Sequence, residues 1–232
     1  MIRRDESNSR WWGADVGRVT DPGLLTLPAA ERDAALAPYA WAELRAPLDA
    51  APDPWTLAGA GFGFTDVQIA FRIRLQPAAP GSSAEELQVL DAAEADFDPG
   101  ARATRPFTHE RFLLLRGADR ERVGDRYTAW ARQLRLEHPT LALHVLRDGE
   151  PQGWFCARPA ERGVELTLAA LYDTATTGGL HLYEAALGAL AARGHRLGHA
   201  SFSVRNTDVL GIYAALGARF TSTDGSWIWQ AT

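Results

Sequence analysis

The sequence predicts an α/β protein. Apolar segments that alternate like β-strands are separated, along most of the 232 residues, by segments with helical spacing. Glycines and prolines mark the boundaries between these segments. An apolar fraction of 46% with 23% charged residues is typical of a soluble globular protein. The length fits one large domain or two small ones.

The composition argues against several classes of partner. The formal net charge is −5 and no basic run is present, so we expect no nucleic-acid partner. No apolar stretch approaches the roughly 20 residues that span a bilayer. The start "MIRRDESNSRWW" lacks the apolar region of a signal peptide. Cys156 is the only cysteine, so no internal disulfide forms, and we expect a cytoplasmic protein.

The first third contains three units of the size of a strand and a helix. Asp53 has the position of an N-cap and Gly61 that of a helix stop. The segment 76–86, "QPAAPGSSAEE", is rich in Pro, Gly and Ser and is the best linker candidate. The predicted elements are strands over 14–19, 41–46 and 66–75 and helices over 27–39 and 53–62.

The segment after the linker predicts a weak helical stretch and then a loop over 97–110. A long helix over 118–138 has apolar and aromatic residues at helical spacing. Strands over 141–146 and 154–159 are joined by a turn at 147–153. The last elements are a strand over 163–172, a helix from about Gly179 to Gly194, a strand over 199–204, a helix over 206–217 and a strand over 226–229.

The stretch "ATTGGLHLYEAAL" places two glycines between a strand and a helix. The first N–H groups of a helix have no partner within the helix, and they point outward at the positive end of its dipole. Glycine lets a phosphate approach such groups closely. By itself the pair Gly178–Gly179 is more typical of a plain strand-to-helix bend than of a phosphate cradle.

The residues downstream favour the cradle. "NTDVLGIYAALGARF" places Asn206 after a strand, Tyr213 seven positions later and Gly217 four beyond. This resembles the second signature of the GNAT acetyltransferase superfamily. The resemblance implies the GNAT fold, a mixed central sheet flanked by helices, and acetyl-CoA as cosubstrate.

The resemblance also implies roles for individual residues. Gly179 matches the last position of the acetyl-CoA pyrophosphate loop, whereas Thr177 and Thr174 depart from the usual Gly and Gln or Arg. A threonine still supplies an N–H, but its side chain weakens the expectation of a close approach. Tyr213 matches the general acid that protonates the leaving thiolate. Cofactor contacts fall on Leu168, Ala169, Ala170, Thr177, Gly178, Gly179, Leu180 and Asn206.

Two of these roles have structural alternatives. Asn206 is equally well explained as a helix cap. The strand segment 168–170, expected to pair with the pantetheine arm, also fits an ordinary interior strand.

The chain as a whole resembles the bacterial N-acetyltransferases of dTDP-fucosamine (dTDP-4-amino-4,6-dideoxygalactose). The segments that carry this are 11–20, 57–73 and 205–218. It implies a small N-terminal partial GNAT-like domain over 1–76, a linker over 77–86 and a GNAT domain over 87–232. A weak internal echo between 55–71 and 212–229, each a short helix, a glycine stop, a loop and a strand, fits a partial duplication.

Other candidate residues remain less specific. Glu165 is the one carboxylate in the strand before the loop, and some GNAT enzymes use such a residue as base; a solvated residue with a water relay is the alternative. Arg102 and Arg105 are candidates for binding a nucleotide diphosphate, although ordinary surface arginines explain them as well. His195 and His199 have metal-like spacing only on a helix, which Gly194 has already ended, so we expect no metal site.

We therefore expect an acetyl-CoA-dependent N-acetyltransferase acting on a small-molecule amine, a nucleotide-linked amino sugar of the dTDP-4-amino-4,6-dideoxyhexose type. Two alternatives stay open. One is a GNAT enzyme for another amine, such as an aminoglycoside, a polyamine or a protein N-terminus. The other is a GNAT-fold binding module without catalysis. A homodimer is also left open.

Overall fold

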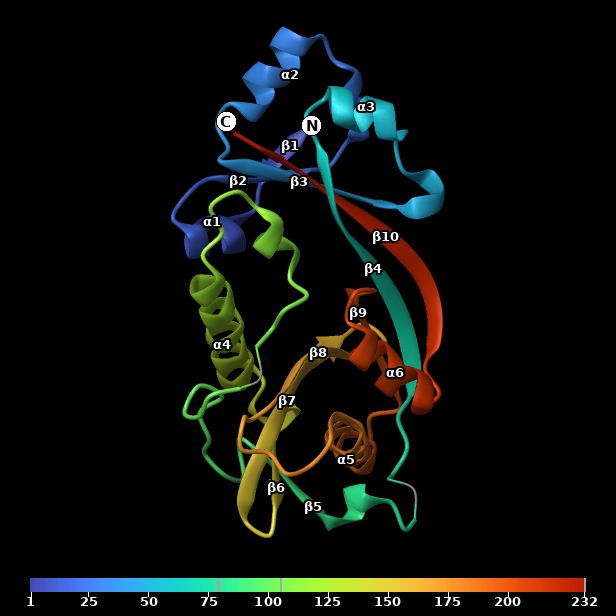
Figure 1. Ribbon diagram of the computed structural model, residues 1–232. Coiled ribbons are helices and arrows are strands. Elements are labelled where there is room, and N and C mark those ends of the chain that lie inside the picture. Colours follow the sequence, from blue (N-terminus) through green and yellow to red (C-terminus); the bar gives the residue numbers. More distant parts are fainter. Residues whose placement is uncertain (79, 105, 232) are drawn as a thin grey trace.

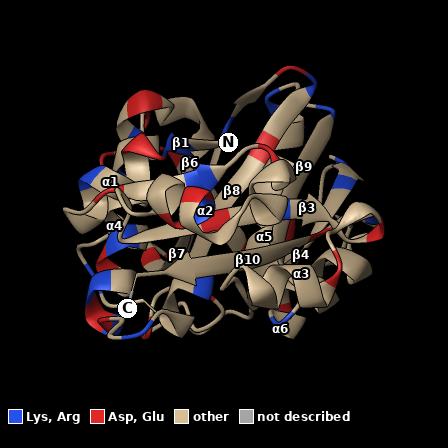
Figure 2. Cartoon of the chain, turned by 90° about the horizontal axis from the view of Figure 1, so that it is seen from above, with Lys and Arg blue, Asp and Glu red and all other residues tan. Residues whose placement is uncertain are grey.

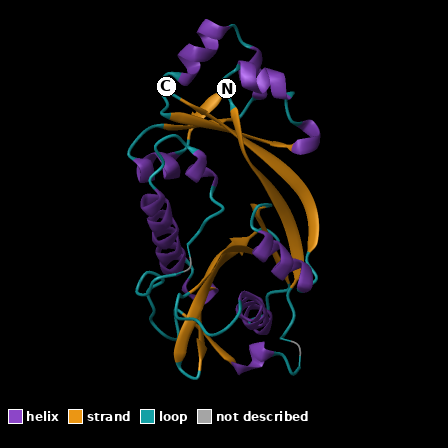
Figure 3. Cartoon of the chain, viewed as in Figure 1, coloured by secondary structure: helices purple, strands orange, loops and turns teal. Residues whose placement is uncertain are grey.

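A single curved sheet runs through the whole molecule. The computed structural model describes residues 1–78, 80–104 and 106–231. Within them, the sheet has ten strands in the order β1-β2-β3-β10-β4-β9-β8-β7-β6-β5, with helices on its faces (Figure 1). The pairs β2/β3 and β8/β9 are parallel. Helices and sheet form the layers seen in Figure 3, which confirms the α/β prediction with a mixed sheet.

The bounds of the elements agree with most sequence-based predictions. The strands are β1 (Ile2–Arg4), β2 (Val16–Val19), β3 (Trp41–Pro47), β4 (Gly63–Arg74), β5 (Leu87–Asp91), β6 (Ala142–Arg147), β7 (Glu150–Ala160), β8 (Gly163–Leu171), β9 (Leu197–Ser203) and β10 (Arg219–Gln230). The α-helices are α1 (Glu6–Trp12), α2 (Ala29–Leu36), α3 (Pro54–Gly59), α4 (Arg120–Glu137), α5 (Gly179–Ala192) and α6 (Thr207–Ala215).

Helices α4 and α5 cover opposite faces of the β5–β9 part of the sheet. Successive residues of β7 alternate between them: Phe155 packs in the cluster that contains α5, and Trp154 and Cys156 pack in the one that contains α4. Burial raises the pKa of the Cys156 thiol to about 12. Cys156 is thus a buried side chain of the core.

The two halves of the chain repeat one plan, which supports the internal echo. Strand, helix, parallel strand, short helix and long strand follow each other as β2-α2-β3-α3-β4 and as β8-α5-β9-α6-β10. Both short helices end at a left-handed glycine, Gly61 with φ 79° and Gly217 with φ 80°. The amide after each glycine bonds back to the carbonyl five residues earlier, that of Leu57 and that of Tyr213. The last strands are exchanged, because β10 pairs with β3 and β4 pairs with β9.

This exchange joins the halves. β4 and β10 are also neighbours, paired antiparallel over most of their length. Hydrogen bonds of the sheet therefore cross the predicted boundary at 77–86, and the separation into domains 1–76 and 87–232 stays a prediction. The hydrophobic clusters also draw on both segments: the one around Leu36 and Leu44 includes Trp227, and the one around Leu143 includes Phe71.

Two sequence-based predictions of local structure are wrong. The weak helical stretch after the linker is strand β5, whose Leu87 packs into the core while Gln88 points to solvent. A five-residue edge strand shows too little alternation to be told from a helix. The turn predicted over 147–153 is confined to Asp148 and Gly149, both with positive φ, and β7 begins directly after them.

Candidate active site

Strands β8 and β9 part from each other and open a cavity. They pair only at Val164–Gly198 and Glu165–His199. Beyond that point β8 runs on to Leu171 and β9 to Ser203 without a ladder between them. A register shift against β7 leaves Thr167 as an extra residue, and such a bulge bends a strand. The parted segments line a cavity of about 1210 Å³.

The predicted strand contacts lie at this opening. Leu168, Ala169 and Ala170 all line the cavity. Their strand pairs with β7 along one edge only, because β9 has moved away from the other. Backbone groups on that free edge can take an extended ligand as an additional strand.

The N-terminus of α5 lies at one end of the opening. Gly178 is the N-cap and Gly179 the first helical residue, and no side chain caps this end. Gly179 and Ile212 line both the large cavity and a neighbouring one of about 420 Å³ between α5 and α6. A Cβ on Gly179 would lie 3.0 Å from Ile212 Cδ1, so the glycine allows the two helices to approach.

The sequence predicts that Thr177 contributes its amide to the pyrophosphate loop, but in the structure this amide is already engaged. Its amide donates to Oε1 of Gln152 at 3.1 Å, and the Thr176 amide donates to the same oxygen at 2.8 Å. Thr177 is buried and lines neither cavity. The buried carboxamide of Gln152 thus occupies the amides that a phosphate would need. The candidate cradle narrows to Gly178, Gly179 and Leu180.

Tyr213 lies inside the cavity within an aromatic group. Its ring centroid is 4.0 Å from that of Phe71 and 5.3 Å from that of Tyr183. Burial raises the pKa of Tyr213 well above 10, and the neighbouring Tyr183 adds to this. The hydroxyl therefore stays protonated, which is the form that a proton donor needs.

Asn206 caps α6. Its Oδ1 accepts a hydrogen bond from the amide of Val209 at 3.2 Å. The same residue lines the cavity, so its side-chain amide group is placed to meet a ligand as well. The capping alternative is confirmed, and the cofactor contact stays a prediction.

Glu165 lines the cavity but is engaged elsewhere. Its Oε2 accepts from Nη2 of Arg158 at 2.7 Å and from Nε at 2.9 Å. About a third of its side chain, 32%, is exposed. The Glu165 carboxylate is therefore already engaged by an arginine.

One of the two predicted diphosphate-binding arginines lies away from the cavity. Arg102 is exposed and does not line the cavity, and Arg105 lies outside the described residues. Acidic and basic residues are interspersed around α1 and α4 (Figure 2). Apart from the adjacent Arg3 and Arg4 on β1, the arginines that do line the cavity come from different elements, so no local sequence motif indicates them. They are Arg3, Arg4, Arg18, Arg45, Arg111, Arg126 and Arg158.

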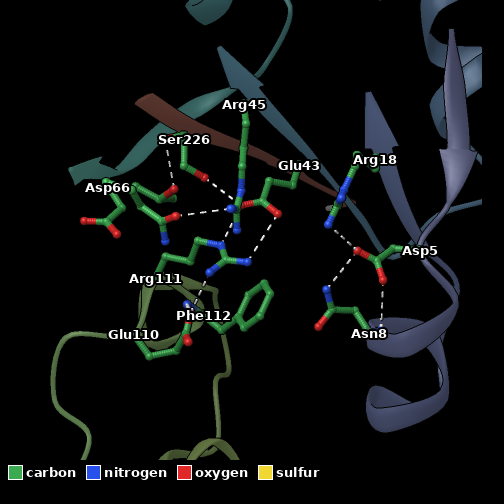
Figure 4. A network of polar contacts seen from close by, with 12 residues as sticks. Asp5, Asn8, Arg18, Glu43, Arg45, Asp66, Glu110, Arg111, Phe112 and Ser226 are labelled. Atoms are coloured by element: carbon green, nitrogen blue, oxygen red, sulfur yellow. Dashed lines mark hydrogen bonds and ion pairs between the residues drawn. The ribbon is translucent and has the colours of Figure 1, made fainter. Parts of the chain in front are cut away.

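A buried ion pair joins the N-terminal part of the sheet to the segment before α4. Arg111 donates to Glu43 through Nε at 2.5 Å and Nη2 at 3.3 Å (Figure 4). Arg45 and Ser226 donate to Oε1 of the same carboxylate at 2.8 and 2.7 Å. Burial alone would raise the pKa of Glu43, but the charges of Arg111 and Arg45 lower it to about 2.

The network continues to the wall of the cavity. Glu110 accepts from Arg111 at 3.2 Å and from the hydroxyl of Tyr127. Burial and the Glu110 charge raise the pKa of Tyr127. Phe107 stacks on Tyr127 with ring centroids 4.2 Å apart, and both line the cavity. This wall therefore combines fixed charges with an aromatic surface.

One acidic residue of the cavity is not among the site residues expected from the sequence. Asp66 on β4 is 2% exposed, lines the cavity and accepts a 2.7 Å hydrogen bond from Ser203 Oγ on β9. In the sequence it is one polar position of an alternating strand. Only the pairing of β4 with β9 brings the two residues together.

Solved structures share this architecture. A GCN5-related N-acetyltransferase from Sphaerobacter thermophilus superposes with a TM-score of 0.54 at 15% identity, over 82% of this chain and 59% of its own. A tandem GNAT protein of the clavulanic acid biosynthesis pathway gives 0.50 at 17% identity, over 95% of this chain and 76% of its own. The chain has the fold of the GCN5-related N-acetyltransferases.

A third similar structure is one region of a longer protein. The GCN5-related glucosamine N-acetyltransferase region of a fungal multi-domain β-N-acetylglucosaminidase gives a TM-score of 0.57 at 9% identity, over 99% of this chain and 31% of that protein. No protein-family model and no curated protein sequence matches the chain.

Two further observations concern metals and membranes. Among the residues that the structure describes, no group of three or more His, Cys, Asp or Glu side chains is arranged to hold a metal ion. None of the helices within the described ranges is long and apolar enough to cross a bilayer.

Proposed function

We propose that the chain is an acetyl-CoA-dependent N-acetyltransferase. The observation that carries this proposal is the opening between β8 and β9, which leads to the uncapped N-terminus of α5 and contains Tyr213. An extended acyl-pantetheine arm suits a free strand edge, and a pyrophosphate suits helical amides. The GNAT fold of the neighbours supports the same assignment.

The residues at the opening fit acetyl-CoA. Backbone groups of Leu168 to Ala170 would hold the pantetheine arm, and the amides of Gly178 to Leu180 would hold the pyrophosphate. When bound, the cosubstrate supplies an activated acetyl thioester. The Tyr213 hydroxyl, which burial keeps protonated, would donate its proton to the departing thiolate.

The half that binds the cosubstrate and supplies the proton donor is the C-terminal one. In the repeated plan, Leu57 of α3 has the position of Tyr213 in α6, and leucine cannot donate a proton. Strands β2 and β3 stay paired over four residues, from Val16–Trp41 to Val19–Leu44. The N-terminal half therefore offers neither the acid nor an opening, and we assign it to binding of the acceptor.

The acceptor is a nucleotide-linked amino sugar of the dTDP-4-amino-4,6-dideoxyhexose type. The cavity extends from the β8/β9 opening to Arg3, Arg18 and Arg126, which suit a diphosphate. Trp11, Phe107 and Trp130 supply aromatic faces for a pyrimidine. A fold neighbour that is a glucosamine N-acetyltransferase region supports an amino sugar as the class of acceptor.

A thermal-shift titration with acetyl-CoA tests the first half of the proposal. Binding to the native state stabilises it by RT ln(1 + [L]/Kd), about 2.7 kcal/mol at a ligand concentration of 100 Kd. We expect the melting temperature to rise with acetyl-CoA and not with acetate. No shift at millimolar acetyl-CoA would favour a binding module without catalysis.

CoA release in the presence of amines tests the second half. We expect release with a dTDP-4-amino-4,6-dideoxyhexose and none with the corresponding dTDP-4-hydroxy sugar. Turnover restricted to aminoglycosides, polyamines or peptide N-termini would keep the acetyltransferase assignment and replace the acceptor.

A further inference from the structure

Asp66 differs from the other buried carboxylates of the molecule. Within the described ranges, four carboxylate side chains are buried, and three of them are ion-paired with arginine: Glu43, Asp91 and Glu110. Among the residues that the structure describes, none forms an ion pair with Asp66 within 4.0 Å, and its side-chain partner is the neutral hydroxyl of Ser203. Ion pairing does not explain why this chain buries an acid there.

The surroundings of Asp66 leave it facing the cavity. On β9, Ser203 bonds to Oδ1; on β10, Ser226 lies opposite Asp66 in the ladder but donates to Glu43. Arg45 of β3 is engaged by Glu43 and Gln68. The positive charges of Arg111 and Arg205 act on the Asp66 carboxylate from a distance.

Burial raises the pKa of the Asp66 carboxyl, although the Ser203 hydrogen bond and these two arginines oppose the rise. A carboxylate with a raised pKa accepts a proton more readily than one held by an ion pair. Glu165, the sequence-based candidate, is held by Arg158. Of these two cavity-lining acids, only Asp66 is without an arginine partner among the described residues, so we take Asp66 as the candidate proton acceptor.

We propose that Asp66 is the general base that accepts a proton from the ammonium group of the acceptor, an assignment that rests on the acetyltransferase function above. The ammonium proton moves to the carboxylate, and the free amine forms the C–N bond with the acetyl carbonyl carbon. The C–S bond breaks, and the thiolate takes the proton of Tyr213. The surplus proton on the acetylated nitrogen passes to solvent. Tyr213 then takes a proton back from solvent, and Asp66 releases its proton to solvent.

The Asp66→Asn variant tests this role. Asparagine keeps the acceptor for Ser203 Oγ and removes a charge that burial disfavours, so we expect an unchanged or higher melting temperature. Acetyl-CoA binding should not change, because it involves β8 and α5. At neutral pH, kcat/KM for the amine should fall about 10²–10⁴-fold. As the pH rises toward the pKa of the substrate amine, this loss of kcat/KM should shrink about tenfold per pH unit, because more of the amine is then free without the help of a base.

The Ser203→Ala variant gives an independent readout on a protein that retains Asp66. Loss of the hydrogen bond that lowers the Asp66 pKa should move the acid limb of the kcat/KM profile to higher pH. Asp125→Asn, on the exposed face of α4 and away from the cavity, is the matched control and should keep the wild-type profile.

The outcomes separate the two proposals. No CoA release by the wild-type protein with any amine overturns the acetyltransferase function and the Asp66 assignment with it. Full kcat/KM in Asp66→Asn beside an active wild type overturns only the assignment. The Asp66 assignment is also overturned if Asp66→Asn loses kcat/KM equally at every pH. The same holds if the pH-dependent loss of kcat/KM is found in Glu165→Gln and not in Asp66→Asn.

Discussion

Arg111 and Glu43 lie 68 residues apart in the sequence and form a two-point ion pair inside the molecule, with Nε and Nη2 at 2.5 and 3.3 Å from the carboxylate oxygens. Their side chains are 9% and 3% exposed. The pair fixes the segment before α4 against strand β3, and so sets the wall of the cavity that carries Glu110 and Tyr127 (Figure 4).

Removing one partner should destabilise the fold strongly. Arg111→Met leaves Glu43 buried with a reduced counter-charge, and such a loss costs about 3–5 kcal/mol in free energy of unfolding. The double variant Glu43→Gln/Arg111→Met should lose less than the two single variants together. Urea unfolding measures these values. Arg120→Met on the exposed side of α4 is the control, and equal losses for the two arginines would contradict the prediction.

Acid should weaken the protein through the same pair. The pKa of Glu43 is about 2 in the folded state against an ordinary value of 4.5. A lowered folded pKa contributes stability above pH 4.5 that is lost as the pH falls from 4.5 toward 2. Urea midpoints across this range should fall less steeply in Glu43→Gln. Asp98→Asn should change the slope less, because the wild-type carboxylate beside Arg132 is 43% exposed and its ion pair is screened by solvent.

Tyr213→Phe should separate chemistry from binding. The ring contacts with Phe71 and Phe202 remain, and the hydroxyl makes no hydrogen bond with the described residues, so the melting temperature should hold. We expect kcat to fall about 10²–10⁴-fold with an unchanged Kd for acetyl-CoA. Tyr172→Phe is the control, because Tyr172 is buried on the other side of the sheet. Near-normal turnover in Tyr213→Phe would remove the acid assignment.

Gln152→Leu should disturb the turn before α5. Three donors converge on Oε1 of Gln152, the amides of Thr176 and Thr177 and the Thr176 hydroxyl. A buried donor left without a partner costs about 1–3 kcal/mol. Unfolding should show a loss of this size, and acetyl-CoA should bind more weakly because the turn leads into Gly178 and Gly179. Gln88→Leu on the exposed side of β5 should leave acetyl-CoA binding intact.

The local elements of the second half could be predicted because their signals are local. Helix α5 starts at Gly179, and α6 has Asn206 as its cap, as the sequence indicates. A glycine stop, a capping side chain and apolar spacing act within a few residues, so they can be seen without any partner. The GNAT fold, in contrast, was implied by the resemblance that Asn206, Tyr213 and Gly217 carry.

The tertiary structure decided what surrounds those elements. Asp66 meets Ser203 across 137 residues, Arg111 meets Glu43 across 68, and Gln152 takes the amide of Thr177 across 25. Such contacts depend on strand register and on the exchange of β4 and β10, which no sequence period encodes. The sequence by itself determined most of the helices and strands and identified Tyr213 as the candidate proton donor. Long-range pairing decided which acid stays without an ion pair and which amides remain free at the start of α5.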